Sequence, residues 1–136
     1  MESSNKDNIQ TVEYGPGIYF LGDPCYVLKK ELWEKATECA GDFAAYEEFA
    51  IAPTMYGDGV YKDAYSGKEF SVDSASLGIV NMRYSERNEN VSVPLDELGA
   101  IIEVNDCVKF EYDEEKRSFR FEIDGAVVFI PTDDEE

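Results

Sequence analysis

One stretch of the sequence, VKFEYDEEKRSFRFEIDGAVVFI at residues 108–130, carries the clearest structural signal in the chain. Apolar and charged residues alternate in its first two segments, which is the two-residue period of a β-strand with one buried face. If EEKR forms the connecting loop, Phe110 lies opposite Phe121. The same register places Lys109 opposite Glu122 on the other face, and a shift by one residue would destroy both pairings. The sequence therefore predicts an antiparallel hairpin.

A third strand is predicted directly after this hairpin. Asp124-Gly125 is the composition favoured by a two-residue type I′ turn, and the apolar run AVVFI follows it. The turn places Val127 beside Glu122 on a face that also carries Phe129, so the last strand is apolar on both faces. Two interpretations stay open. Either this is a central strand covered by a helix or another sheet, or it is an edge that meets a partner, with Val127 and Phe129 as interface candidates.

The remainder of the chain is expected to form short strands and one helix. Apolar residues recur at three- and four-residue steps between Lys30 and Cys39, which predicts a helix there. Strands are expected at residues 17–21, 25–28, 46–52, 60–65, 69–73 and 77–84. The predicted fold class is mainly β (α+β): an antiparallel barrel-like or sandwich sheet with one packed α-helix at about residues 30–39.

The distribution of polar residues predicts three regions. We expect a flexible leader at residues 1–12, a single β-rich domain at residues 13–131, and an acidic tail at residues 132–136.

The charge of the chain excludes several classes of function. Its 136 residues include 12 Lys and Arg against 30 Asp and Glu, with no His, for a net charge of −18. A Ser-His-Asp triad, a Cys-His pair or a His-ligated zinc site therefore cannot be built from this chain alone. A basic groove for nucleic acid is equally disfavoured, because such binding depends on clustered Lys and Arg. We expect no metal site, no cofactor and no direct contact with nucleic acid.

The cysteines and the apolar runs indicate a cellular location. Cys25, Cys39 and Cys107 are widely spaced and odd in number, which favours free thiols in a reducing cytosol over a disulfide framework. No apolar run approaches the ~18 residues of a membrane-spanning helix. The N-terminus also lacks the apolar stretch of a signal peptide. We expect a cytoplasmic protein without a membrane partner.

Three Gly/Asp-containing segments are candidates for a binding pocket. They contain Asp23, Asp58 and Asp73, each placed at the end of a predicted strand. In one interpretation these carboxylates bind local backbone N–H groups and hold turns. In the other they converge on one pocket, whose walls are Cys25, Tyr26, Tyr56 and Tyr61.

The same segments resemble those of a group of small bacterial and phage proteins. The order GDPCYV, a Trp-containing helix, YGDGVY and VDS followed by LG carries this resemblance, over roughly residues 17–80. The resemblance implies a β-rich fold and a prokaryotic or viral cytosol. It implies no reaction and transfers no catalytic residue.

Three functions are consistent with these features. The first is a non-catalytic acidic binding module, of the kind that a phage or mobile element uses to modulate or inhibit another protein, whose partner presents a basic surface. The second is a DNA mimic that occupies the basic groove of a nucleic-acid-binding protein. The third is a small-ligand-binding protein or enzyme that uses the Asp23, Asp58 and Asp73 pocket. The missing catalytic signature favours a non-catalytic protein, while the sequence identifies neither the partner nor the oligomeric state.

Overall fold

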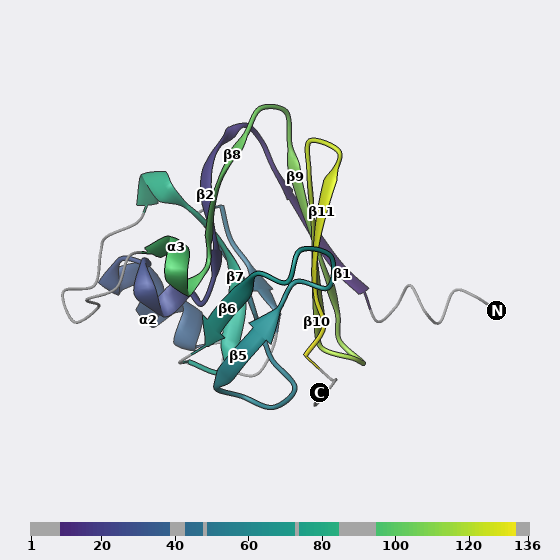
Figure 1. Ribbon diagram of the computed structural model, residues 1–136. Coiled ribbons are helices and arrows are strands. Elements are labelled where there is room, and N and C mark those ends of the chain that lie inside the picture. The colour runs from purple at the N-terminus through teal and green to yellow at the C-terminus, as the bar shows by residue number, and fades with distance from the viewer. Residues whose placement is uncertain (1–8, 39–42, 48, 73, 85–94, 133–136) are drawn as a thin grey trace.

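The protein is built in three layers, in which one helix, a five-stranded sheet and a four-stranded sheet lie one behind another (Figure 1). This computed structural model describes residues 9–38, 43–47, 49–72, 74–84 and 95–132. Both sheets are antiparallel. The predicted class, a mainly β fold with one packed helix, is confirmed in its sandwich form, because the described strands pack as facing sheets and do not close into a barrel.

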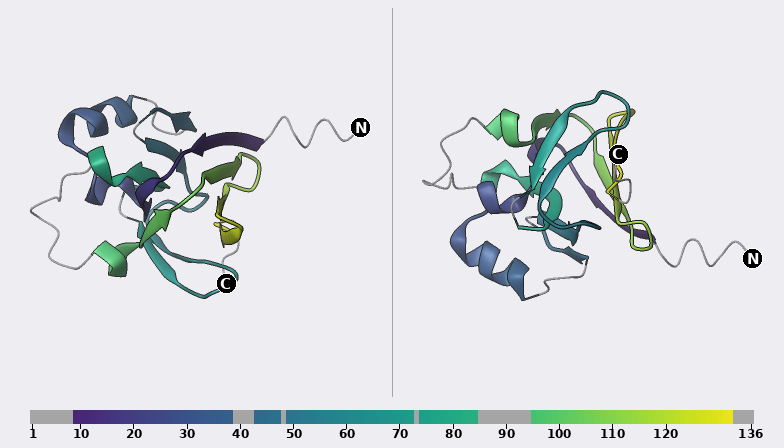
Figure 2. Two further views of the ribbon diagram at one scale, coloured as in Figure 1. Left: turned by 90° about the horizontal axis from the view of Figure 1, so that it is seen from above. Right: turned by 60° about the horizontal axis from the view of Figure 1, so that its bottom comes forward.

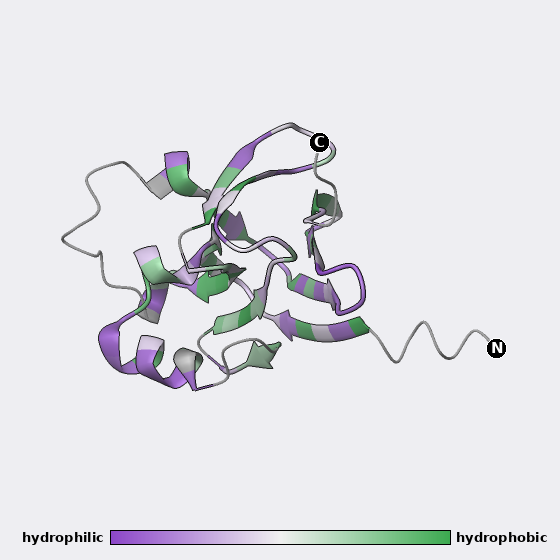
Figure 3. Ribbon diagram, turned by 90° about the horizontal axis from the view of Figure 1, so that it is seen from below, coloured by the Kyte–Doolittle hydropathy of each residue, from purple (hydrophilic) through white to green (hydrophobic). Residues whose placement is uncertain are grey.

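The four-stranded sheet contains the sequence segment that determines its register. Its strands are β1 (Ile9–Tyr14), β9 (Val108–Asp113), β10 (Ser118–Ile123) and β11 (Ala126–Ile130), in the order β1-β9-β10-β11. Phe110 pairs with Phe121 and Lys109 pairs with Glu122, as the alternation predicts. The Asp124-Gly125 turn sets the predicted register between β10 and β11, and both of its residues have positive φ. The alternation appears as bands of contrasting hydropathy along the strands in Figure 3.

The five-stranded sheet lies between the other two layers. Its strands, in spatial order, are β3 (Ala44–Ala45), β4 (Phe49–Pro53), β7 (Ser76–Asn81), β2 (Gly17–Gly22) and β8 (Ala100–Val104). A separate hairpin consists of β5 (Gly59–Lys62) and β6 (Glu69–Val72). The helical elements are the 3-10 turns η1 (Pro24–Tyr26) and η2 (Met82–Tyr84) and the α-helices α2 (Lys30–Thr37) and α3 (Leu95–Leu98).

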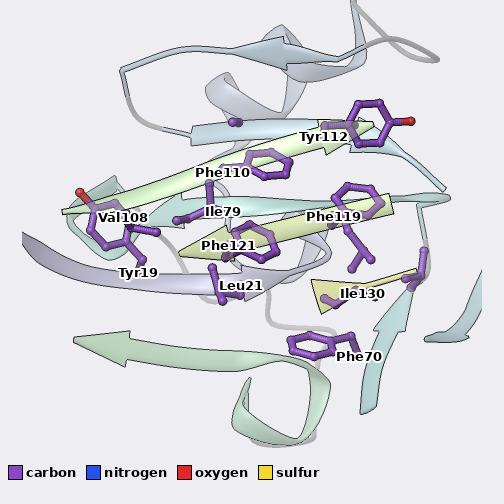
Figure 4. Close-up of a cluster of buried hydrophobic side chains, with 14 of the residues drawn as sticks. Tyr19, Leu21, Phe70, Ile79, Val108, Phe110, Tyr112, Phe119, Phe121 and Ile130 are labelled. Carbon is purple, nitrogen blue, oxygen red and sulfur yellow. The ribbon is translucent and has the colours of Figure 1, made fainter. Parts of the chain in front are cut away.

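The main core fills the space between the two sheets. Successive side chains of a strand point to opposite faces, so Tyr19 and Leu21 of β2 face the four-stranded sheet. They meet the aromatic side chains of β9 and β10, which Figure 4 shows gathered between the strands. The Phe110 ring stacks on Phe121 at 4.8 Å between centroids, and it lies 5.9 Å from the Phe119 ring. These fully buried rings stack within the four-stranded sheet and hold the two sheets together through apolar burial.

A second core forms between the five-stranded sheet and α2. Phe20 of β2 and Phe49 of β4 point toward the helix and are fully buried. Leu32, Trp33 and Ala36 of α2 pack against them, so the predicted apolar face of the helix is the buried one. The helix ends at Thr37, and Cys39 lies outside the described residues. Among the described residues, no helix has the length and apolar character required to cross a bilayer.

The structure corrects two of the predicted boundaries. The leader was expected to span residues 1–12, but Ile9–Val12 belong to β1 and pair with β9, while residues 1–8 lie outside the described residues. Thr132, expected in the acidic tail, is fully buried. Its hydroxyl accepts a 2.9 Å hydrogen bond from the Met55 N–H and donates one to the Arg117 carbonyl oxygen. Short polar segments are thus ordered here by distant partners.

Several predicted strands also differ. Those predicted at residues 60–65 and 77–84 end at Lys62 and Asn81. Residues 25–28 were expected to be extended, but Pro24–Tyr26 form the 3-10 turn η1, because Pro24 fixes its own φ and the Asp23 carboxylate caps the turn. The central-strand interpretation of residues 126–130 is wrong, since β11 lies at the edge of its sheet.

We predict that Gly78→Ala destabilises the protein by about 3 kcal/mol, because a Cβ at this position of β7 would overlap the carbonyl oxygen of Ala50 on neighbouring β4. Urea unfolding followed by tryptophan fluorescence measures the loss. Gly15→Ala is the matched control, since a Cβ there meets nothing within 4 Å. Equal unfolding midpoints for the two variants would contradict the close approach of β4 and β7.

Candidate interaction surface

The three Gly/Asp segments meet in space, but the carboxylates of Asp23 and Asp58 have different surroundings. Asp23 is fully buried. Its carboxylate accepts hydrogen bonds from the Cys25 N–H at 2.9 Å, the Ser74 N–H at 2.7 Å and the Ser74 hydroxyl at 2.6 Å. It therefore joins η1 to the turn between β6 and β7. This is the turn-holding role of a carboxylate, and a side chain without solvent contact is not open to a ligand.

The second segment is linked to the same turn through Thr54, which lies just before it. The Thr54 N–H donates to the Ala75 carbonyl oxygen at 3.0 Å, and the Thr54 hydroxyl donates to the Gly57 carbonyl oxygen at 2.8 Å. The Tyr61 hydroxyl also donates to Gly57, at 2.8 Å, so Tyr61 holds this turn from within. Asp58 is exposed on the turn.

The remaining residues of the predicted pocket are dispersed. Cys25 and Tyr26 are partly buried in η1, and Tyr26 packs against the core beneath α2. Tyr56 is 53% exposed. Asp73 lies outside the described residues. The structure thus brings the segments together around residues 74–76, while burying Asp23 and exposing Asp58.

The β5–β6 hairpin reaches the four-stranded sheet and covers part of its β11 edge. Its tip lies beside β11 in both views of Figure 2. The Ala64 N–H donates to the Phe129 carbonyl oxygen at 2.7 Å, and the Phe129 N–H donates to Asp63 Oδ1 at 2.9 Å. Both outward backbone groups of Phe129 are therefore satisfied by the hairpin, which protects a strand edge that would otherwise be open.

Asp63 organises this contact. Only 5% of the residue is exposed, and its carboxylate also accepts hydrogen bonds from the Tyr65 and Ser66 N–H groups and from the Ser66 hydroxyl. Burial opposes ionisation, but the hydrogen bonds from Ser66, Phe129 and Tyr65 outweigh it and lower the pKa of Asp63. The carboxylate is ionised at neutral pH and fixes both the hairpin tip and the strand edge.

Large apolar side chains are exposed along this hairpin and beside it. Val60 of β5 is 57% exposed, and Tyr65 at the tip is 71% exposed. Val127 and Phe129 of β11 are half-buried on the outer face of the four-stranded sheet. We call these four residues the hairpin–edge surface. Sequence reasoning identified Val127 and Phe129, but it missed Val60 and Tyr65, since nothing local indicates that their hairpin reaches β11.

Alternating charges occupy the rest of the outer face. Arg120 contacts Glu122 beside it on β10, and its Nη1 lies 3.2 Å from Glu111 Oε1 on β9. Lys109 Nζ lies 3.7 Å from Glu111 Oε2. The hydrogen bond with Glu122 is the main reason why the pKa of Arg120 is raised. The carboxylates of this face thus alternate with the Lys and Arg side chains that pair with them.

An acidic pocket opens at one end of the same face. It has a volume of about 410 Å³ and is lined by Glu13, Asn105, Asp106, Cys107, Lys109, Glu122, Asp124 and Gly125. Asp124 shapes it by accepting hydrogen bonds from the N–H groups of residues 105–107, and these bonds, led by that of Asn105, lower its pKa. Loss of solvent around the thiol, followed by the charge of Asp106, raises the pKa of Cys107, so the thiol stays protonated. The arrangement suits a cation better than nucleophilic chemistry.

Neither metal-binding geometry nor similarity to known proteins identifies a function for this surface. Within the described residues, no group of three or more Cys, Asp or Glu side chains is arranged to hold a metal ion. Comparison with protein-family models, curated proteins and solved structures found no match.

We predict that Asp63→Asn lowers the free energy of unfolding by about 2 kcal/mol at pH 7, because charged acceptors make the stronger hydrogen bonds. The pKa of Asp63 is lower in the folded protein than its usual value of about 3.9. Its contribution is therefore present above that usual value and is lost as the pH falls through the folded pKa. Urea unfolding at several pH values should show the two proteins converging in acid.

Asp58→Asn is the matched control for this prediction, because Asp58 is an exposed carboxylate at the opposite end of β5 from Asp63. Its substitution should change stability by less than about 0.5 kcal/mol. The assignment is wrong if the two substitutions have the same effect at pH 7.

Proposed function

We propose that this protein is a non-catalytic binding module that engages another protein through the hairpin–edge surface. The observation that carries the proposal is the position of the last strand. Its apolar side chains Val127 and Phe129 lie at a sheet edge, and the N–H groups of Phe129 and of the exposed Tyr65 both bond to Asp63 Oδ1. Exposed apolar and aromatic residues that gather at one place, with charged residues around them, are typical of protein interfaces.

The chemistry of this surface supports a protein partner. Tyr and Phe provide large contact areas at a low cost in conformational entropy, and aromatic residues are enriched among those that dominate binding energy. Arg120 and Glu122 lie directly beside Phe129 and Val127 and would form a polar rim. The net charge of −18 favours a partner with a basic surface, since long-range attraction accelerates encounter.

Neither alternative function has a comparable observation in its favour. Mimicry of DNA calls for continuous rows of carboxylates, whereas Lys109 and Arg120 interrupt the carboxylates of the outer sheet face. A ligand pocket built on Asp23 is disfavoured, because the Asp23 carboxylate is buried and already accepts hydrogen bonds from Ser74 and Cys25.

The proposal places the protein in the cytosol of a bacterium or of a phage-infected cell, as a modulator or inhibitor of a host protein. Cys107 is a free thiol, in keeping with a reducing compartment.

We predict that the tagged protein retains a stoichiometric partner from a bacterial lysate, and that Val60→Ser/Tyr65→Ser weakens this complex at least tenfold, because the exposed apolar anchors are lost. Quantitative pull-down followed by mass spectrometry and titration of the purified partner measures the effect. Raising the salt concentration should slow association, since it screens the attraction between the acidic protein and its partner.

Ile18→Ser/Ile101→Ser is the matched control, because these residues are 50% and 45% exposed and lie on β2 and β8 of the other sheet. It should bind as the unmodified protein does. Repeated failure to retain any stoichiometric partner, or a partner that both double variants retain equally, would refute the proposal.

A further inference from the structure

The outer edge of β11 is hydrogen-bonded to the hairpin tip at Phe129 but not at Val127. In an antiparallel pair, residues alternate between those whose N–H and C=O face the partner strand and those whose groups face away. Phe129 belongs to the second set, because its N–H and C=O bond with Asp63 and Ala64 of the hairpin tip. Val127 lies two residues earlier and belongs to the same set, yet among the described residues its outward N–H and C=O have no backbone partner.

This open position adjoins the acidic pocket. Val127 is paired with Glu122, and Gly125, just before β11 begins, is also part of the pocket wall. The pocket holds four carboxylates, those of Glu13, Asp106, Glu122 and Asp124, against the single amine of Lys109. A strand added at Val127 would therefore lie near a group of carboxylates that outnumber the one amine among them.

We propose that an extended basic peptide segment adds to β11 as a further strand at Val127 and extends a Lys or Arg side chain toward the acidic pocket. This inference rests on the proposed protein-binding function and names the chemistry of the partner. The Val127 N–H and C=O would pair with the peptide backbone, which is the mode of recognition by strand addition.

The geometry of a sheet explains why a long cationic side chain fits. Neighbouring strands are about 4.8 Å apart, so the added strand would lie two spacings, or about 10 Å, from the row that contains Glu122. A Lys or Arg stem can lie along the apolar Val127 side chain while its charged end reaches the carboxylates. The row Glu13, Lys109, Glu122, Val127 crosses the sheet in register, which gives such a side chain a defined path.

Charge separates this occupant from a second copy of the chain. Two copies joined through their β11 edges would bring two molecules of net charge −18 together beside their acidic pockets. Like charges placed across an interface oppose association, whereas a basic segment neutralises the pocket. The hairpin tip at Phe129 limits the added strand on the other side, so the pairing is short and its affinity depends on the charged contact.

The experiment uses a fluorescein-labelled peptide of sequence KVKVKVK, titrated with the full-length protein and followed by fluorescence anisotropy at low and at physiological salt. We expect saturable binding that weakens with salt. The acidic peptide EVEVEVE should not bind. A KVKVKVK peptide that is N-methylated at its Lys residues should bind at least tenfold more weakly, because the lysine placed opposite Val127 then lacks the N–H group that antiparallel strand pairing needs.

Two protein variants locate the site. Val127→Pro removes the outward N–H without removing a hydrogen bond to β10, and proline is tolerated at such edge positions. It should weaken binding at least tenfold, while Val127→Thr, which keeps the backbone groups, should not. Glu13→Gln/Asp106→Asn should weaken binding severalfold. Glu31→Gln/Glu97→Gln, which removes the same charge from α2 and α3, should have little effect.

The outcomes separate this inference from the proposed function. Lack of KVKVKVK binding, equal binding of the N-methylated peptide, or equal binding by Val127→Pro and Val127→Thr overturns strand addition. So does dimerisation of the free protein, seen by analytical ultracentrifugation and abolished by Val127→Pro, which would assign the edge to a second copy. In each of these cases, retention of a lysate partner that depends on Val60 and Tyr65 leaves the proposed function intact. Failure of that retention refutes the proposed function, whatever the peptide does.

Discussion

The register of β9 against β10 is the constraint on which the rest of the structure depends. It directs Phe110, Phe119 and Phe121 inward, where they are fully buried and form the floor of the main core. The five-stranded sheet packs on these rings, and α2 packs on the far side of that sheet. The same register leaves the charged residues outside as an ion-paired face. A slip by one residue would bury Arg120 and Glu122 and expose the aromatic rings, so packing and surface chemistry are fixed together.

Carboxylates that accept backbone hydrogen bonds join the parts of this sandwich. Asp23 ties η1 to the β6–β7 turn, Asp63 ties the β5–β6 hairpin to β11, and Asp124 ties the β10–β11 turn to the loop before β9. Each bridges segments that are distant in sequence. Part of the acidic character of the chain thus serves the fold, and only the remaining exposed carboxylates, such as Glu13 and Asp106 of the acidic pocket, are available to attract a partner.

The surface that we assign to binding results from incomplete coverage of one strand. A run that is apolar on both faces is stable at a sheet edge only if something covers it. The hairpin covers β11 at Phe129, through Asp63 and Ala64, and leaves Val127 open beside the acidic pocket. The apolar residues of β11 and the charges that would recruit a partner therefore lie along the same strand edge.

Local patterns were sufficient for the parts of the fold in which neighbours in sequence are neighbours in space. The two hairpins of residues 108–130, their registers and the apolar face of α2 followed from periodicity and turn composition, because strand and helix periods are properties of a short segment. Pairing between distant segments was not accessible in this way. Ile9–Tyr14 has no strong pattern of its own and becomes a strand because β9 offers it a partner, while β11 has the composition of a central strand but lies at an edge. Of the binding surface, the sequence by itself determined the apolar character of Val127 and Phe129. Only the tertiary structure decided that the Tyr65 and Phe129 N–H groups bond to one carboxylate and that Asp23 is buried, because both depend on contacts between segments more than 50 residues apart, such as Asp63 with Phe129 and Asp23 with Ser74.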